Sequence, residues 1–179
     1  MKRKKRKGNN KDFNKKAEGP LGMSFSMIFS IILIIVFVMV AFIAVRYFLN
    51  LQACAKTGDF VSDIKNKVTQ AWQSEGHETT MTSYLPSKID YICFADLTKP
   101  LKGTNQQLLD EIEYYGGPPD SNMFIYPKEN ACDIPSHKIP HLDMEYITKS
   151  RNPYCIAVNK GVLKIKIEKA LNTGLVKLS

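Results

Sequence analysis

The stretch that decides the fold is MSFSMIFSIILIIVFVMVAFIAV, which occupies residues 23–45. It contains no charged residue, no Gly and no Pro, and its polar side chains are those of Ser24, Ser26 and Ser30. At about 1.5 Å of rise per residue, a helix of this length covers roughly 35 Å, enough to cross a hydrocarbon core of roughly 30 Å. We therefore predict a transmembrane helix over this stretch. The alternative is a core helix of a soluble protein, which usually keeps a polar face.

Basic residues gather on the N-terminal side of the apolar stretch. Residues 1–22 contain nine of the 25 Lys and Arg and two of the 17 Asp and Glu, so they carry +7 of the formal net charge of +8. The positive-inside rule places this end in the cytoplasm and the rest of the chain, beyond the span, outside the cell. We expect residues 1–22 to be a disordered tail attracted to anionic lipid, with binding of RNA or of a cytoplasmic protein as the alternative. Because the remaining residues are nearly neutral, no nucleic-acid partner is expected.

Removal of a leader is a competing interpretation of the same residues. A secretory signal peptide has a shorter apolar core and a cleavage site of small residues, whereas Arg46, Tyr47 and Phe48 follow the apolar stretch here. A prepilin-type cleavage would fall before that stretch, after Gly22, and would leave it in the mature chain. Both the anchored full chain and cleavage after Gly22 stay open.

The apolar pattern thins to a stripe beyond the predicted span. Over residues 46–73, apolar residues recur mostly three or four positions apart, which indicates one face of an amphipathic helix that continues the membrane helix. Gly58 interrupts the stretch and predicts a kink or a weakened turn. The stripe consists of Tyr47, Leu51, Cys54, Val61, Ile64, Val68 and Trp72.

Residues 74–179 change to the two-residue period of half-buried strands. Thr104 and Gln107 form a capping box that predicts a short helix, ended by Gly116-Gly117-Pro118-Pro119, and another helical turn or two is expected within 141–150. The connection Asn159-Lys160-Gly161, with Gly where a positive φ is needed, predicts a hairpin of the two strands that flank it. The expected strands are 89–94, 123–126, 154–158 and 162–168, with 175–178 as a last edge strand. The predicted fold class is α+β: a long N-terminal helix, membrane-spanning in its first half, packed on a small antiparallel β-sheet head.

All four cysteines, Cys54, Cys93, Cys132 and Cys155, follow the predicted span. An even number of cysteines in an oxidising compartment predicts two disulfides, and three pairings are possible; four buried free thiols are the alternative. We favour Cys132 with Cys155, because the intervening stretch is loop-rich, and this leaves Cys54 to bridge the long helix to Cys93.

The sequence offers one candidate metal site and no enzymatic motif. Cys132, His137 and His141 have a spacing that zinc ligands permit, with Cys93 or Cys155 as a fourth ligand. Pro135 and Pro140 interrupt that segment, so its histidines are not held one helical turn apart. The acidic residues Asp110, Glu111 and Glu113 on the predicted short helix are typical of a solvated face. We expect no catalytic activity and no cofactor.

The basic tail, Gly22, and the run Met23 to Ser30 together resemble a type IV pilin or pseudopilin. Bacterial-type pilins carry Glu at the fifth mature position, where cleavage after Gly22 would place Met27; archaeal pilin-like proteins are less strict there, but tend to have a charged residue where this chain has Leu21. The segments SFSMIFSII (24–32), YICF (91–94) and NPYC (152–155) also resemble uncharacterised single-span archaeal proteins.

This resemblance implies a single-pass, extracytoplasmic protein with a structural or surface-interaction role. Its partners would be the lipid bilayer, other surface proteins, and further copies of the chain that assemble through the apolar helix. The contacts between copies would involve Phe25, Phe29, Leu33 and Phe37. The alternative function is a surface-anchored ligand- or metal-binding domain that uses Cys132, His137 and His141.

Overall fold

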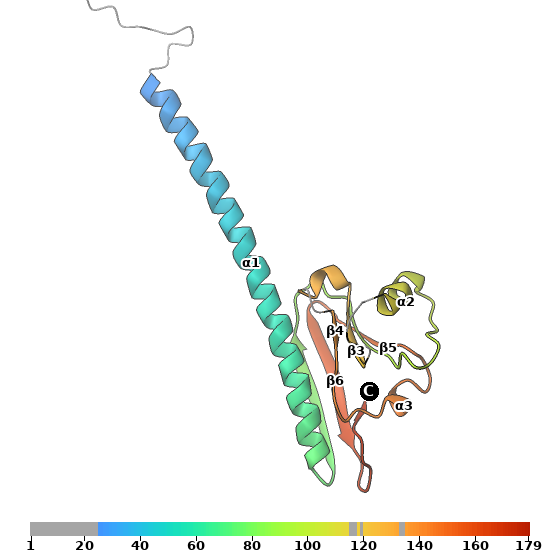
Figure 1. Ribbon diagram of the computed structural model, residues 1–179. Coiled ribbons are helices and arrows are strands. Elements are labelled where there is room, and N and C mark those ends of the chain that lie inside the picture. The colour runs from blue at the N-terminus through green and yellow to red at the C-terminus, as the bar shows by residue number, and fades with distance from the viewer. Residues whose placement is uncertain (1–24, 115–117, 119, 133–134) are drawn as a thin grey trace, which may run out of the picture. The chain divides into compact units, whose positions relative to one another are not determined.

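The computed structural model describes residues 25–114, 118, 120–132 and 135–179 (Figure 1). The predicted basic tail and the predicted cleavage site at Gly22 lie outside the described residues. The chain divides into two compact units, residues 1–46 and 47–179. The first unit is described from Phe25 onward as helix, and the second contains the folded head.

The helix α1 spans Phe25–Gln73 and runs without interruption through Gly58, so the predicted kink is not observed. Within the first unit its large apolar side chains are all exposed, from 40% for Ile28 to 83% for Phe25. Among the described residues, α1 is the one helix long and apolar enough to cross a membrane by length and composition. The predicted membrane helix is thus a candidate anchor.

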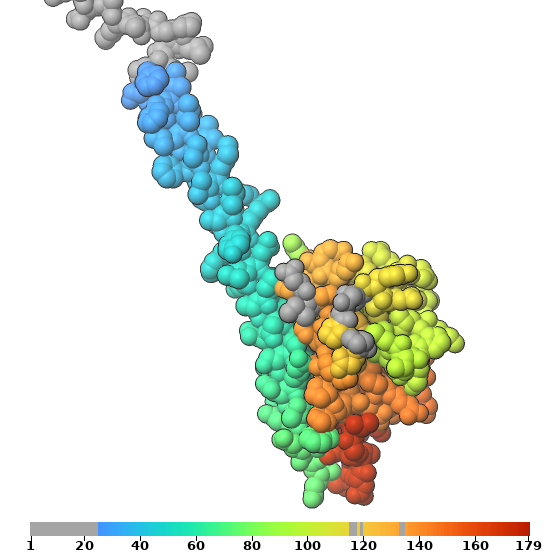
Figure 2. Space-filling view, viewed as in Figure 1, coloured from blue at the N-terminus to red at the C-terminus, as the bar shows by residue number. Residues whose placement is uncertain are grey.

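The second part of α1 has a buried face that begins later than the sequence pattern indicates. Tyr47 and Leu51 remain 72% and 57% exposed, because they precede the point at which the helix meets the head. The residues of α1 that are buried in the head follow helical spacing: Thr57, Phe60, Val61, Ile64, Val68 and Ala71. Figures 1 and 2 show this part of the helix lying directly along the body of the head.

The head is α+β, as predicted, but it contains two antiparallel sheets instead of one. The three-stranded sheet has the order β1–β6–β7, and the four-stranded sheet has the order β4–β3–β2–β5. The strands are β1 (His77–Tyr84), β2 (Tyr91–Phe94), β3 (Met123–Tyr126), β4 (Ser136–His137), β5 (Tyr154–Ala157), β6 (Val162–Lys169) and β7 (Lys177–Leu178). The helical elements after α1 are α2 (Gln106–Glu113), the 3-10 turn η1 (Lys128–Asn130) and α3 (Met144–Ile147).

The predicted hairpin between the strands at 154–158 and 162–168 is wrong, although its turn forms. Asn159 and Val162 exchange backbone hydrogen bonds of 3.0 and 2.9 Å, with φ of 52° at Lys160 and 77° at Gly161. Beyond the turn the strands separate, since β5 pairs with β2 and β6 pairs with β1 along eight residues. A turn determines only the reversal of the chain; the partner of each strand depends on the apolar face that it can cover.

Two independent constraints favour glycine at position 161 in this turn. Its positive φ favours glycine, and a Cβ there would lie 2.8 Å from the carbonyl oxygen of Leu85. The carbonyl oxygen of Gly161 accepts a 2.8 Å hydrogen bond from the Leu85 amide, and this bond extends the β1–β6 pairing by one residue. The turn therefore joins three segments of the head.

The four-stranded sheet lies between two apolar clusters. On one face, Ile92, Phe94, Met123 and Ile125 join the buried residues of α1, β1 and β6 in the larger cluster. On the other face, Cys93, Phe124 and Tyr126 pack against the α2 residues Leu108, Leu109 and Ile112. Alternate residues of β2 and β3 thus face different layers, as the two-residue period of a strand requires.

The start of α2 differs by one residue from the predicted capping box. The N-cap is Asn105, not Thr104, and its Oδ1 accepts a 3.1 Å hydrogen bond from the Leu108 amide. Asn caps a helix as well as Ser or Thr does, so either residue satisfied the local rule. Of the predicted terminator, only Pro118 lies within the described residues.

Candidate functional site

The four cysteines form two disulfides, but the predicted pairing is wrong. Cys54 is bonded to Cys132 and Cys93 to Cys155, with Cα–Cα distances of 5.4 and 4.0 Å. Cys93 and Cys155 occupy directly opposite positions in β2 and β5. This proximity comes from the pairing of β2 with β5. The loop-rich stretch between Cys132 and Cys155, on which the predicted pairing depended, carries no information about that strand pairing. Both bonds are of the kind that persists in an oxidising compartment.

The predicted metal ligands are not brought together as a ligand set. Cys132 is bonded to Cys54 and has no thiolate to offer. His137 lies in β4 opposite Met123, while the ring of His141 stacks on Trp72 with centroids 3.7 Å apart. Over the described ranges there is no group of three or more His, Cys, Asp or Glu side chains placed to hold a metal ion.

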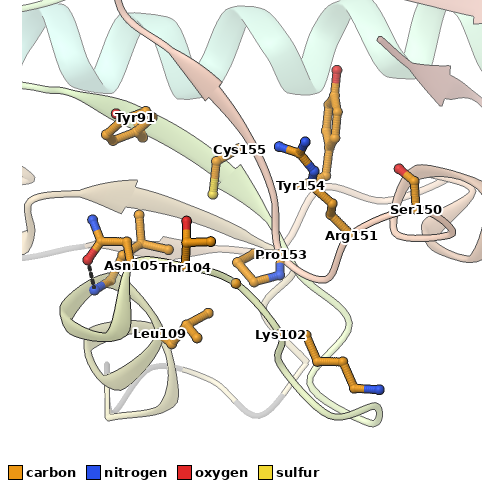
Figure 3. Close-up of a pocket in the computed structure, with 12 residues that line it drawn as sticks. Tyr91, Lys102, Thr104, Asn105, Leu109, Ser150, Arg151, Pro153, Tyr154 and Cys155 are labelled. Atoms are coloured by element: carbon orange, nitrogen blue, oxygen red, sulfur yellow. Dashed lines mark hydrogen bonds between the residues drawn. The ribbon is translucent and has the colours of Figure 1, made fainter.

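The head contains a hollow of about 820 Å³ where β2 and β5 meet the start of α2 and the loops that precede α2 and β5 (Figure 3). Aromatic and apolar residues make up half of its lining, and hydroxyl, amide and basic residues contribute most of the rest. We call this feature the β5 hollow. Its lining residues are Tyr91, Lys102, Gly103, Thr104, Asn105, Leu108, Leu109, Ser150, Arg151, Pro153, Tyr154 and Cys155.

A buried asparagine joins the two loops that border the β5 hollow. Asn152 is 8% exposed, and its Oδ1 accepts a 3.0 Å hydrogen bond from the Asp96 amide. Its Nδ2 donates to the Asp96 carbonyl at 2.9 Å and lies 3.4 Å from the carbonyls of Lys99 and Pro100. Its own carbonyl accepts a 2.6 Å bond from the Lys102 amide. Residues 96–102 are thereby held against residue 152, some 50 positions later in the chain.

These joined loops make one side of the β5 hollow basic. Lys102 and Arg151 are exposed, and neither has an ion-pair partner within the described part of the chain. Both residues line the hollow, and the Lys102 side chain extends outward from its rim (Figure 3). Lys99 lies three residues before Lys102 on the same loop, and its Nζ is 3.3 Å from Oδ2 of Asp96. Two unpaired cations therefore border the hollow.

Asp96, the acidic residue of this loop, is occupied by its own neighbours. Its Oδ1 accepts hydrogen bonds from the Thr98 hydroxyl at 2.6 Å and the Thr98 amide at 3.0 Å. The Thr98 hydroxyl bond is the main cause that lowers the pKa of Asp96 from its ordinary value of 3.8, and Lys99 adds to this against the opposing effect of burial. Asp96 is thus ionised at neutral pH, and its carboxylate already interacts with Thr98 and Lys99 of the same loop.

The floor of the β5 hollow is aromatic and apolar. Tyr91 is 37% exposed and stands 6.1 Å, centroid to centroid, from Tyr126. Tyr126 is buried under α2, and burial is the main cause that raises its pKa, with the carboxylates of Glu111, Asp90 and Glu129 acting in the same direction. Tyr126 therefore remains a neutral phenol around neutral pH.

The residue types that line the β5 hollow suit binding more than catalysis. Among its described lining residues there is no carboxylate and no histidine, and Cys155 is bonded to Cys93. General acid–base catalysis near neutral pH usually depends on such groups. What the hollow offers is cationic, hydroxyl, amide and aromatic contact.

Sequence reasoning missed this hollow. The two basic stretches that border it, KPLKG (99–103) and KSRNP (149–153), are visible as short Lys- and Arg-bearing loops with Pro. Neither stretch indicates that the two loops lie side by side, because their contact depends on the hydrogen bonds of the Asn152 side chain and on the pairing of β5 with β2.

No protein-family model, no curated protein and no solved structure matches this chain.

Proposed function

We propose that this chain is a single-pass membrane protein with a cytoplasmic N-terminus and a disulfide-bonded head outside the cell, where it has a structural or surface-interaction role. The observation that carries the proposal is the division of α1. Over Phe25–Val45 every residue of the helix is exposed and all but Ser26 and Ser30 are apolar, and from Thr57 onward the same helix supplies a buried face to the head. An apolar surface of that length needs lipid or other helices to cover it.

The residues that follow the apolar stretch fit a membrane interface. Arg46 is the first charged residue after it, and Tyr47 and Phe48 come next with their side chains exposed. Aromatic residues with polar edges are enriched where a span leaves the hydrocarbon core. The two disulfides, both in residues 47–179, support an oxidising compartment for the head.

Pilin-like assembly is the finer form of this proposal. A long N-terminal helix followed by antiparallel strands is the architecture that the resemblance implies, and Phe25, Phe29, Leu33 and Phe37 are exposed along the apolar helix. Helices of neighbouring copies would pack through these side chains within the membrane or in a fibre. In the membrane, the basic residues of 1–22 would contact anionic lipid.

Protease accessibility on intact cells tests the topology. We expect proteinase K on intact cells to remove an epitope placed after Ser179. In chains that retain residues 1–22, it should spare an epitope placed before Met1 until the membrane is opened. Protection of the C-terminal epitope in intact cells would contradict the proposed orientation.

The mature N-terminus and the state after gentle solubilisation test pilin-like processing and assembly. Pilin-like processing predicts Met23 as the first residue in mass spectrometry, and assembly predicts that cross-linking in membranes traps copies through the apolar helix. An intact basic N-terminus would contradict leader cleavage without affecting the anchor. Recovery of monomers alone would contradict assembly.

A further inference from the structure

We propose that the β5 hollow binds a sugar unit bearing a carboxylate or sulfate group, as part of an acidic polysaccharide outside the cell. The inference rests on the proposed function only in that the head must lie outside the cell to meet such a polymer. The location of the hollow, its charge and its lining are independent of the topology.

The charge of the hollow selects an anion. Lys102 and Arg151 are unpaired among the described residues, and the described lining contains no acid to oppose them. The guanidinium of Arg151 can donate two parallel hydrogen bonds to a carboxylate or sulfate, and the Lys102 amine adds a mobile point charge on a flexible stem. A neutral ligand would gain less from these two groups than an anion, and a cationic ligand would be repelled by them.

The rest of the lining selects a hydroxylated ring. Tyr91 presents aromatic surface, and Leu109 and Pro153 add apolar contact (Figure 3). Tyrosine combines such surface with a phenolic hydroxyl, so its apolar body and polar edge match the two aspects of a sugar ring. Hydroxyl groups of a sugar could bond to the exposed Thr104 and Ser150 side chains, for which no bond is recorded within the described residues.

The frame around the hollow is already rigid. The Asn152 hydrogen bonds hold one loop against the other, and the Cys93–Cys155 disulfide ties β5 to β2 beneath them. A preorganised site loses less conformational entropy on binding than one that must be assembled. The hollow, of about 820 Å³, is open to solvent, which suits a unit within a longer polymer chain.

The test uses the full chain in nanodiscs of neutral phosphatidylcholine, so that the result does not depend on orientation in the cell. Three probes of similar length are titrated: a heparin-derived oligosaccharide, an oligogalacturonate and a neutral malto-oligosaccharide. We expect at least one acidic probe to bind at least about tenfold more tightly than the neutral one, with an affinity that falls as salt rises. Absence of binding by both acidic probes, or equal binding of the neutral probe, overturns the proposal.

Matched variants separate the hollow from general charge. Lys102→Gln with Arg151→Gln is expected to lower the affinity for the acidic probe about tenfold or more. The control, Lys67→Gln with Lys88→Gln, makes the same change in net charge at exposed sites outside the hollow and should leave the affinity within about twofold. An equal loss of affinity in both double variants overturns the proposed binding site, because it would indicate that the acidic probe is attracted to the positive charge of the protein as a whole.

Two further measurements fix the ligand class. Tyr91→Ala should weaken the acidic probe several-fold, whereas Tyr84→Ala, which removes an exposed tyrosine outside the hollow, should not. Duplex DNA of matched charge should bind more weakly than the acidic sugar; equal binding with the same dependence on Lys102 and Arg151 overturns the assignment to sugars. Circular dichroism of each variant checks that it is folded. If no acidic sugar binds, the protease result on topology is unaffected, so the two proposals can fail separately.

Discussion

The buried side chains of Asn122 and Asn152 form hydrogen bonds with backbone groups that elsewhere in the head are paired with other backbone groups. Asn122 donates from Nδ2 to the Ile139 carbonyl at 2.9 Å and accepts from the Ile139 amide at 2.8 Å, which imitates a strand pair. Asn152 satisfies carbonyls and an amide of residues 96–100. A side-chain amide suits these positions because it carries both a donor and an acceptor.

Asn152→Ala is expected to lower the free energy of unfolding by about 1 to 3 kcal/mol, because it leaves the partly buried amide and carbonyl of Asp96 without their partner. Urea unfolding followed through Trp72, the single tryptophan of the chain, measures this. Asn152→Asp keeps the acceptor for the Asp96 amide but loses the donor, so it should also destabilise. Asn66→Ala, at an exposed position of α1, is the control; a similar loss there would contradict the role of Asn152.

The low pKa of Asp96 predicts an acid-dependent contribution to stability. Because folding favours the ionised form, this stabilisation is present above pH 3.8 and is lost as the pH falls through the lower pKa of the folded chain. Asp96→Asn should therefore be less stable than the wild type above pH 3.8, and the difference should shrink below it. Chemical unfolding followed by circular dichroism on both sides of that pH measures this, and a constant difference would contradict the assignment.

At the element scale, the pairing of β1 with β6 gives neighbouring residues of β1 different roles. The Leu85 amide bonds to the Gly161 carbonyl, so in this register odd-numbered residues of β1 direct their backbone groups toward β6. Even-numbered residues such as Thr80 and Thr82 direct theirs toward the open edge. Their side chains are exposed, while those of Met81 and Ser83 are buried.

Proline substitutions test this register. Ser83→Pro removes an amide that bonds to β6, whereas Thr82→Pro removes one that points to the open edge. Relative to alanine at the same position, we expect Ser83→Pro to cost at least about 2 kcal/mol more of unfolding free energy than Thr82→Pro. Urea unfolding of the four variants measures the difference, and equal costs would contradict the register.

The disulfides are the covalent links between elements. Cys54–Cys132 and Cys93–Cys155 close segments of 78 and 62 residues, for which the chain-entropy relation gives about 4 to 5 kcal/mol each. Replacing either pair by serine should lower the urea midpoint substantially. As a control for pairing, peptide mapping without reduction should recover Cys93 linked to Cys155; recovery of Cys132 linked to Cys155 would contradict the structure.

At the scale of the whole molecule, one helix belongs to two compact units. The buried core residues of the head all lie within residues 47–179, and the apolar part of α1 contributes none of them. The apolar segment is therefore dispensable for the core.

A fragment of residues 52–179 should fold as a soluble monomer with two disulfides. It omits the exposed Tyr47, Phe48, Leu49 and Leu51 and keeps Cys54. Size-exclusion chromatography, intact mass and cooperative thermal unfolding measure this. Aggregation of the fragment, with the full chain monodisperse in detergent, would contradict the independence of the head.

The local features of this protein follow from the sequence by itself. The long helix, its apolar first part, the strands β2, β3 and β6, and the turn at Gly161 each depend on residues close together in the chain. Hydrophobic period and glycine conformation report such features directly. β1 escaped prediction because in HETTMTSY only Met81 is a large apolar residue facing the core.

The tertiary structure decided every feature that joins distant residues. It paired β6 with β1 instead of β5, placed Cys93 opposite Cys155, removed Cys132 from the predicted zinc ligands, and formed the β5 hollow from two loops about 50 residues apart. These outcomes depend on which apolar faces are covered together and which polar groups then need partners. That is a property of the packed whole, which no local spacing in the chain records.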